Sequence, residues 1–192
     1  MLLENKRIGF ALSGSFCTLA AVIPQIQALV TEGAEITPIF SESVAKYDTR
    51  FGSANDWLTQ VEAITGKKPL NSIVAVEPIG PKQLLDLLIV APCTGNTLGK
   101  LAAGITDSCI TMACKAHLRN QRPLLLAIAT NDALSASAPN IGQLLNTKNI
   151  YFVPYKQDDP VVKCNSMVAE MKLILPAVVA ALEGKQMEPV IL

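Results

Sequence analysis

The chain has 192 residues, of which 50% are apolar and only 5% aromatic, and its formal net charge is zero. This length suits one domain over residues 1–192, which can bury a core without disulfides or metal ions. The zero net charge, without any run of Lys or Arg, disfavours nucleic acid and anionic membrane surfaces as partners.

The N-terminal segment is the first predicted structural unit. Its apolar run after Lys6 and Arg7 is broken by the polar residues 13–15, which argues against a signal peptide or a membrane span. We expect a strand over residues 7–12 and a helix over 16–31 instead, because the apolar side chains of 16–31 recur at helical spacing.

The following segments continue the alternation of strands and helices. The first half adds a strand at 35–40, a helix at 55–64, a minor strand at 71–76 and a short helix at 79–86. The second half predicts strands at 87–91, 123–129 and 150–155, and helices at 97–105, 108–120, 141–146 and 161–183, the last kinked at Pro176. This order predicts an α/β fold, a doubly wound parallel sheet in a Rossmann-like or flavodoxin-like three-layer sandwich.

Small polar residues follow four of the predicted strands. In such a sheet, ligands bind beyond the carboxyl ends of the strands. Glycines there let backbone N–H groups approach an anion, and helix N-termini add partial positive charge. The candidate cofactor-binding residues are Ser13, Gly14, Ser15, Ser41, Ser43, Thr94, Gly95, Asn96 and Thr97.

Two kinds of nucleotide are disfavoured by what these segments lack. Neither the GxGxxG fingerprint of dinucleotide sites nor a GxxxxGK[ST] loop occurs, so a mononucleotide suits the chain better than NAD or ATP. No Lys or Arg directly follows these strands, so the pocket is expected to be neutral. Ser, Thr and Asn also cap helices, and the sequence does not decide between capping and binding for any one cluster.

The cysteines and the single histidine have no spacing typical of a metal site, and we predict none. Scattered cysteines in odd number are typical of a reducing, cytoplasmic protein whose thiols fill core space, Cys93 included. His117 lies between Lys115 and Arg119 on a predicted helix, where we expect it to be solvated or at an interface.

Several segments together resemble the flavoprotein family of homo-oligomeric flavin-containing cysteine decarboxylases. They are "GFALSGSF", "FSESV", "APCTGNTLGKLAAGITDS" and "RPLLLAIATNDALSASAPNIGQLL", and the similarity covers nearly the whole chain. The third resembles the family block P-A-x-T-A-N-T-x-x-K-x-A-x-G-x-x-D. Its matching residues are Pro92, Thr94, Asn96, Thr97, Lys100, Ala102, Gly104 and Asp107.

The resemblance implies bound FMN and a role for each candidate. Ser13, Gly14, Ser15 and Ser41 would hold the phosphate, with Ser43 as a helper. The segment 94–97 would line the phosphate and isoalloxazine side. Asn131 would lie near the substrate and is the one candidate catalytic residue. Family members build flavin sites between subunits of a trimer, sometimes packed into dodecamers, so a homo-oligomer is implied.

Two departures from the family separate the functional hypotheses. The family's catalytic histidine is replaced by Pro78-Ile79-Gly80-Pro81, and its P-x-M-N-x-x-M loop reads "ATNDALS". Our first hypothesis is an FMN-binding subunit of an oxidoreductase-type enzyme, which acts with a separate dehydrogenase subunit on a small dicarboxylate heterocycle. The alternatives are a scaffold or regulatory partner that has lost the flavin, and an independent flavin-dependent decarboxylase.

Overall fold

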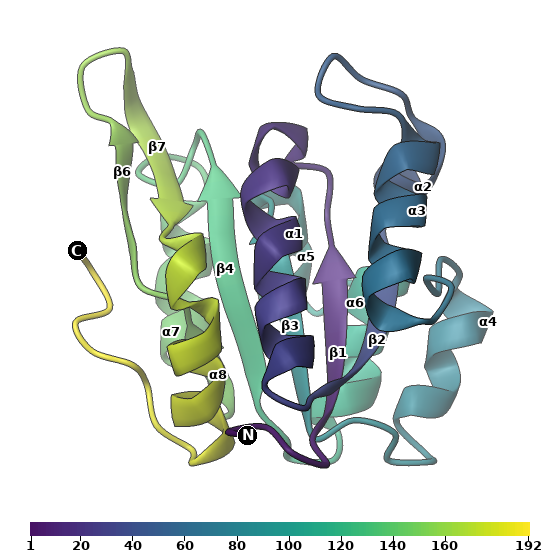
Figure 1. Ribbon diagram of the computed structural model, residues 1–192. Coiled ribbons are helices and arrows are strands. Elements are labelled where there is room, and N and C mark those ends of the chain that lie inside the picture. The colour runs from purple at the N-terminus through teal and green to yellow at the C-terminus, as the bar shows by residue number, and fades with distance from the viewer.

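Seven strands form one mixed sheet in the computed structural model, which describes all residues 1–192 (Figure 1). The strands are β1 (Arg7–Leu12), β2 (Glu35–Phe40), β3 (Leu87–Cys93), β4 (Leu124–Thr130), β5 (Ile150–Phe152), β6 (Tyr155–Asp159) and β7 (Lys163–Ala169). Strands β2, β1, β3, β4 and β5 are parallel neighbours in that order, which is the flavodoxin-like arrangement. The predicted α/β fold is therefore confirmed.

Helices cover both faces of the sheet (Figure 1). One layer holds α1 (Phe16–Thr31), α3 (Ala54–Thr65) and α8 (Ile174–Leu182), with the short α2 (Glu42–Lys46) after β2. The other holds α4 (Ile73–Val76), α5 (Gly95–Ala102), α6 (Cys109–Leu118) and α7 (Ala138–Leu145). None of these helices combines the length and the apolar character that crossing a bilayer requires.

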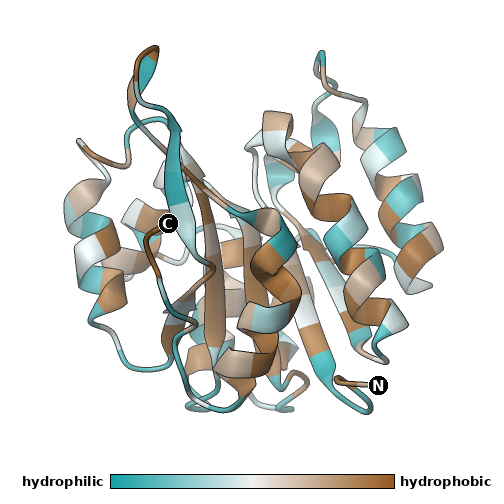
Figure 2. Cartoon of the chain, turned by 60° about the vertical axis from the view of Figure 1, so that its left-hand side comes forward, coloured by the Kyte–Doolittle hydropathy of each residue, from teal (hydrophilic) through white to brown (hydrophobic).

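The central strands form the core. Every residue of β3 is buried, as expected for a parallel strand covered on both faces. The aromatic rings of Phe10, Phe40 and Phe152 are fully buried on the neighbouring strands. The apolar sides of the helices face this sheet, and their polar residues lie outside (Figure 2). Because these buried strands are parallel, their carboxyl ends lie together at one edge of the sheet.

An ion-pair network fixes the opposite end of the sheet. The Asp86 carboxylate accepts hydrogen bonds from Arg7 Nη2 at 2.8 Å and from Arg122 Nη1 at 3.2 Å, which joins the starts of β1, β3 and β4. Partial burial raises the pKa of Asp86, but the hydrogen bonds and charge of Arg7, and the charge of Arg122, lower it further, so the net shift is downward. Asp86 therefore stays ionised between the two arginines.

The C-terminal part of the sheet corrects two predictions. The sheet is mixed rather than wholly parallel, because β7 pairs antiparallel with both β4 and β6. The long helix predicted over 161–183 is wrong: β7 occupies its first part, and only the 3-10 helix η2 (Met171–Leu173) and α8 are helical. The chain reverses after β6, where Asp159 Oδ1 accepts the N–H groups of Val161 and Val162 at 3.1 and 2.9 Å. This turn places β7 antiparallel beside β6.

Three shorter predictions also need correction. Residues 71–76 hold helix α4, not a strand, because Ser72 caps it by accepting the Ala75 N–H at 3.2 Å. The helix predicted over 79–86 is a turn after the 3-10 helix η1 (Glu77–Ile79), in which Gln83 adopts φ 49°. The strand predicted over 150–155 ends at Phe152, and β6 begins after Pro154, which has no N–H to donate.

Candidate functional site

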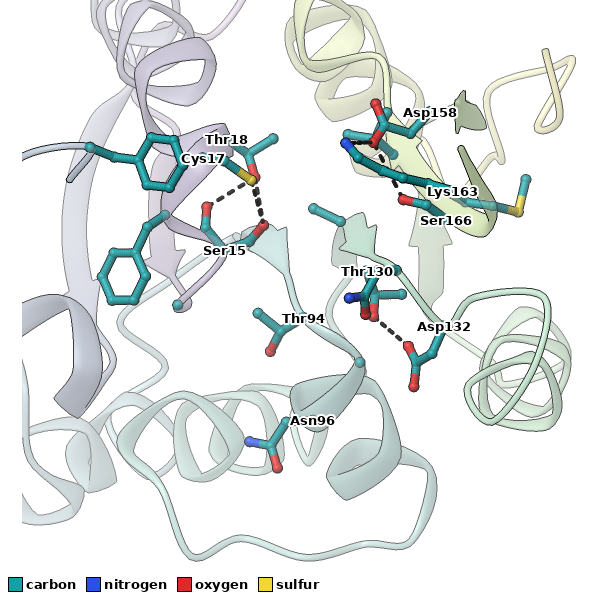
Figure 3. A pocket seen from close by; sticks show the side chains of 18 residues that line it. Ser15, Cys17, Thr18, Thr94, Asn96, Thr130, Asp132, Asp158, Lys163 and Ser166 are labelled. Atoms are coloured by element: carbon teal, nitrogen blue, oxygen red, sulfur yellow. Dashed lines mark hydrogen bonds and ion pairs between the residues drawn. The ribbon is translucent and has the colours of Figure 1, made fainter. Parts of the chain in front are cut away.

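A cavity of about 910 Å³ opens at the carboxyl ends of β1, β3 and β4 (Figure 3). Its volume is in the range of small-molecule and cofactor sites. Two groups of residues line it. The strand-end wall comprises residues 14–18, 94–96 and 129–132; the hairpin wall comprises Asp158, Lys163 and residues 166–168; Phe51 completes the rim.

The start of α1 presents free backbone donors to this cavity. Ser15 is the N-cap residue, but its hydroxyl bonds the Thr18 hydroxyl at 2.7 Å and accepts no backbone N–H. The N–H of Gly14 likewise has no acceptor in the chain. Because α1 is a helix of 16 residues, its unpartnered first-turn N–H groups carry partial positive charge toward the cavity. An anion is the ligand that such a helix end binds.

The serines after β2 support this loop from behind. A Cβ on Gly14 would lie 2.7 Å from Ser43 Oγ, so only glycine lets the two loops approach so closely. Ser41 accepts the Val44 N–H at 3.3 Å and caps α2, and its hydroxyl bonds that of Ser43 at 3.0 Å. Ser41 and Ser43 therefore position the loop and do not line the cavity.

Two further candidates hold the strand ends together. Buried Ser13 donates its hydroxyl to Pro92 O at 2.6 Å and accepts the Thr94 N–H at 3.1 Å, which links the loops after β1 and β3. The Thr94 side chain accepts the Thr97 N–H at 3.3 Å and caps α5, and the two hydroxyls lie 3.0 Å apart. Thr97 is buried beneath the wall.

The structure thus divides the candidate residues into two sets. Six line the cavity: Gly14, Ser15, Thr94, Gly95, Asn96 and Asn131. Four lie behind it: Ser13, Ser41, Ser43 and Thr97. Both functions that the residue types allow, capping and lining, therefore occur, and Thr94 does both.

The hairpin wall was missed by sequence reasoning. Lys163 Nζ lies 2.8 Å from Asp158 Oδ2, and Ser166 donates its hydroxyl to the same oxygen at 3.4 Å (Figure 3). The hydrogen bond from Lys163 to Asp158, and the charge of Asp158, raise the pKa of Lys163. The expected neutral pocket is wrong, because Asp132, Asp158 and Lys163 all line it. The Asp159-Pro160 dipeptide was the turn signal that could have revealed the hairpin.

Three of the cysteines and the single histidine lie in the core. Cys93 and Cys114 are fully buried, and burial raises the pKa of both thiols, so the core-filling prediction for Cys93 is confirmed. His117 is fully buried too, which corrects the prediction of a solvated or interface residue. Its Nε2 donates to Pro123 O at 3.0 Å, its Nδ1 has no partner, and burial lowers its pKa to about 4. It does not line the cavity.

Comparisons with known proteins identify relatives that are similar in sequence and in fold. The B subunit of dipicolinate synthase from Bacillus subtilis (strain 168) is 49% identical over 189 residues, which are 98% of this chain and 94% of that protein. The crystal structure of the dipicolinate synthase B subunit from Bacillus halodurans C superposes with a TM-score of 0.92 at 44% identity, covering 100% of this chain and 98% of that one.

More distant structures share the fold. The FMN binding protein AtHal3 superposes with a TM-score of 0.64 at 22% identity, over 91% of this chain and 95% of that one. A phosphopantothenoylcysteine decarboxylase from Mus musculus is 27% identical over 68% of this chain and 63% of its own length. The model of the Flavoprotein family matches residues 2–184, nearly the whole chain. The chain belongs to the Flavoprotein family.

Proposed function

We propose that this chain is the B subunit of a dipicolinate synthase, which acts with a dehydrogenase subunit to convert dihydrodipicolinate to dipicolinate, a spore metabolite. The observation that carries the proposal is 49% identity over nearly the full length of a protein of that name. The dehydrogenase subunit would bind the nicotinamide cofactor, because this chain has no dinucleotide fingerprint.

FMN is the cofactor that the strand-end wall suits. The unpartnered N–H groups at the start of α1, with Gly14 and Ser15, offer a phosphate site without a buried cation. Thr94, Gly95 and Asn96 line the same cavity and would flank the ring system. A bound flavin would supply a two-electron acceptor. The residues of the chain would hold it, orient the substrate beside it and exclude bulk water.

The hairpin wall suits a dicarboxylate substrate. Lys163 is the one cation lining the cavity, and Ser166 and Asn131 add a hydroxyl and an amide nearby. Cations and amides are the groups that bind carboxylates most strongly. We propose that Lys163 binds a substrate carboxylate while it stays paired with Asp158, since an ammonium has three N–H donors, and that Asn131 contacts the same ligand.

A non-catalytic scaffold is the second candidate. It is favoured by the changed loop around Asn131 and by the absence of an imidazole from the cavity lining. That absence also speaks against an independent decarboxylase, since residues 78–81 hold Pro, Ile, Gly and Pro where the family resemblance places the histidine. Homo-oligomerisation stays a prediction, supported by an apolar groove that exposes Leu134, Leu145, Ile191 and Leu192.

Reconstitution tests these candidates against each other. Dipicolinate formation is measured with the dehydrogenase subunit alone, with this chain alone and with both, and FMN binding is followed in the visible spectrum. We expect the full rate only with both subunits, and FMN binding at micromolar concentration. A full rate from the dehydrogenase alone would leave this chain a scaffold, and carbon dioxide released from a peptidyl or pantothenoyl cysteine would make it a decarboxylase.

A further inference from the structure

One carboxylate that lines the cavity, that of Asp132, has no cation partner. Asp132 lies in the strand-end wall directly after Asn131. Its Oδ1 accepts a hydrogen bond from the Thr130 hydroxyl and another from the Ser137 hydroxyl at 2.9 Å (Figure 3). Its Oδ2 accepts none from the chain, and no Lys or Arg pairs with it, unlike Asp158.

Backbone hydrogen bonds also hold Asp132 in place. Its carbonyl accepts the N–H groups of Ser135 and Ser137 at 3.0 and 3.1 Å. Ser137 is only 2% exposed, so its hydroxyl cannot exchange Asp132 for water without moving the turn. One carboxylate oxygen is therefore fixed by the protein, and the other is left for a ligand or solvent.

The neighbouring helix is shaped around this carboxylate. A Cβ on Gly95 would lie 2.6 Å from Thr130 Oγ1, 2.7 Å from Asp132 Oδ1 and 2.8 Å from Ser137 Oγ. Any other residue at the start of α5 would displace the cluster. Gly95 thus admits an anionic group into the wall of the cavity.

The chemistry of the proposed function requires a proton acceptor there. Converting a dihydropyridine to a pyridine breaks one ring C–H bond, whose electron pair leaves with the hydrogen as hydride to a flavin or nicotinamide. A second hydrogen leaves the ring as a proton, and its bonding electrons stay in the ring and complete the aromatic system. Hydride transfer does not remove that proton from the ring, so a base must receive it and pass it to solvent.

The other titratable groups that line the cavity suit this step less well. Lys163 is protonated beside Asp158, and that pair occupies the carboxylate of Asp158. The hydrogen bond and charge of Asp158 raise the pKa of Lys163, so it is a poor proton acceptor. Cys17 lies across the cavity at the start of α1, and His117 is buried elsewhere. Asp132 is the one carboxylate in the lining without a cation.

We propose that Asp132 is the catalytic base that accepts the ring proton when the dihydropyridine is aromatised, and that Thr130 and Ser137 position it. This assignment rests on the function proposed above. Asn131 is proposed to contact the substrate, whereas the loss of Asp132 would slow the chemical step itself.

The test compares Asp132→Asn with the surface control Glu77→Gln, whose exposed side chain makes no hydrogen bond or ion pair, in the complex with the dehydrogenase subunit. We expect Asp132→Asn to lower kcat about 100-fold or more, with KM changed less than about threefold. It should also bind dipicolinate about fivefold more tightly, because the product has a nitrogen lone pair and two carboxylates that a carboxylate repels and an amide does not. A merely structural role would not tighten product binding.

A milder variant keeps the inference testable if Asp132→Asn unfolds. Ser137→Ala removes one hydrogen bond to the carboxylate and should lower kcat about fivefold at unchanged KM. An unchanged kcat in Asp132→Asn, or in Ser137→Ala when only that variant folds, overturns the assignment. If the wild-type complex itself makes no dipicolinate, the proposed function fails instead, and the two failures are told apart by that first measurement.

Discussion

The two walls of the cavity are built on different principles. The strand-end wall follows directly from buried parallel strands, and its polar residues are fixed by caps and loop-to-loop hydrogen bonds such as that from Ser13 to Pro92. The hairpin wall projects beyond the sheet (Figure 1), and the Val161 and Val162 side chains in its turn are 90% and 79% exposed. A rigid wall suits a cofactor that stays bound, and a projecting wall suits a substrate that enters and leaves.

The largest expected effect tests the strand-end wall as the phosphate site. Ser15→Asp places a carboxylate at the start of α1, where it repels a phosphate but caps the helix well. We expect FMN affinity to fall about 1,000-fold, while the protein becomes up to about 1 kcal/mol more stable. Flavin titration and thermal unfolding measure the two effects.

The matched control is Ser53→Asp, at the capped start of α3 outside the cavity. Its FMN affinity should equal that of the wild type. Unchanged FMN affinity in Ser15→Asp would place the cofactor elsewhere and remove the assignment of this wall.

We expect acid to lower the free energy of unfolding through the buried His117. The pKa of His117 is about 4 in the folded chain and about 6.5 when unfolded, so the unfolded state binds a proton first. The His117 contribution is therefore fully present above pH 6.5, is lost as the pH falls toward 4 and changes no further below. We expect a loss of about 3 kcal/mol in the free energy of unfolding, measured with urea.

A variant that cannot titrate separates this effect from general acid sensitivity. His117→Gln keeps a donor for Pro123 O, and its stability should change less between pH 6.5 and 4 than that of the wild type. If the free energy of unfolding falls equally with pH in the two proteins, His117 does not cause the loss of stability in acid.

The close packing of Gly95 against the Asp132 cluster should also have a measurable effect on stability. Gly95→Ala forces a methyl group against three oxygen atoms, and we expect it to lower the free energy of unfolding by about 2 kcal/mol. Gly142→Ala in α7 is the control, because nothing lies within 4 Å of its Cβ position. That variant should gain up to about 1 kcal/mol from helix propensity. Equal stability of the two variants would contradict the packing around Asp132.

The smallest effect addresses the hairpin wall. Lys163→Gln removes the cation of the cavity, and we expect dipicolinate to bind about tenfold more weakly at unchanged FMN affinity. Lys185→Gln, in an exposed pair with Glu183, should change neither affinity. Equal losses of FMN and dipicolinate affinity in Lys163→Gln would mean that the two walls do not divide the ligands as proposed.

The sequence by itself determined the parallel part of the fold and the location of the site. Buried strands such as β3 are continuous apolar runs, and α1 repeats its apolar residues at helical spacing, so both are encoded locally. The ends of the strands could also be predicted, because each apolar run stops at small polar residues. Six of the ten candidate residues line the cavity, because carboxyl ends of parallel strands must meet at one edge.

Tertiary structure alone decided the rest. Residues 163–169 become a strand because they pair with β4 and β6, and no local pattern records those partners. Whether a hydroxyl caps a helix, as Ser41 does, or faces a ligand, as Ser15 can, depends on which loop lies beside it. His117 is polar in sequence but buried in space, since burial is set by the whole fold rather than by neighbours along the chain.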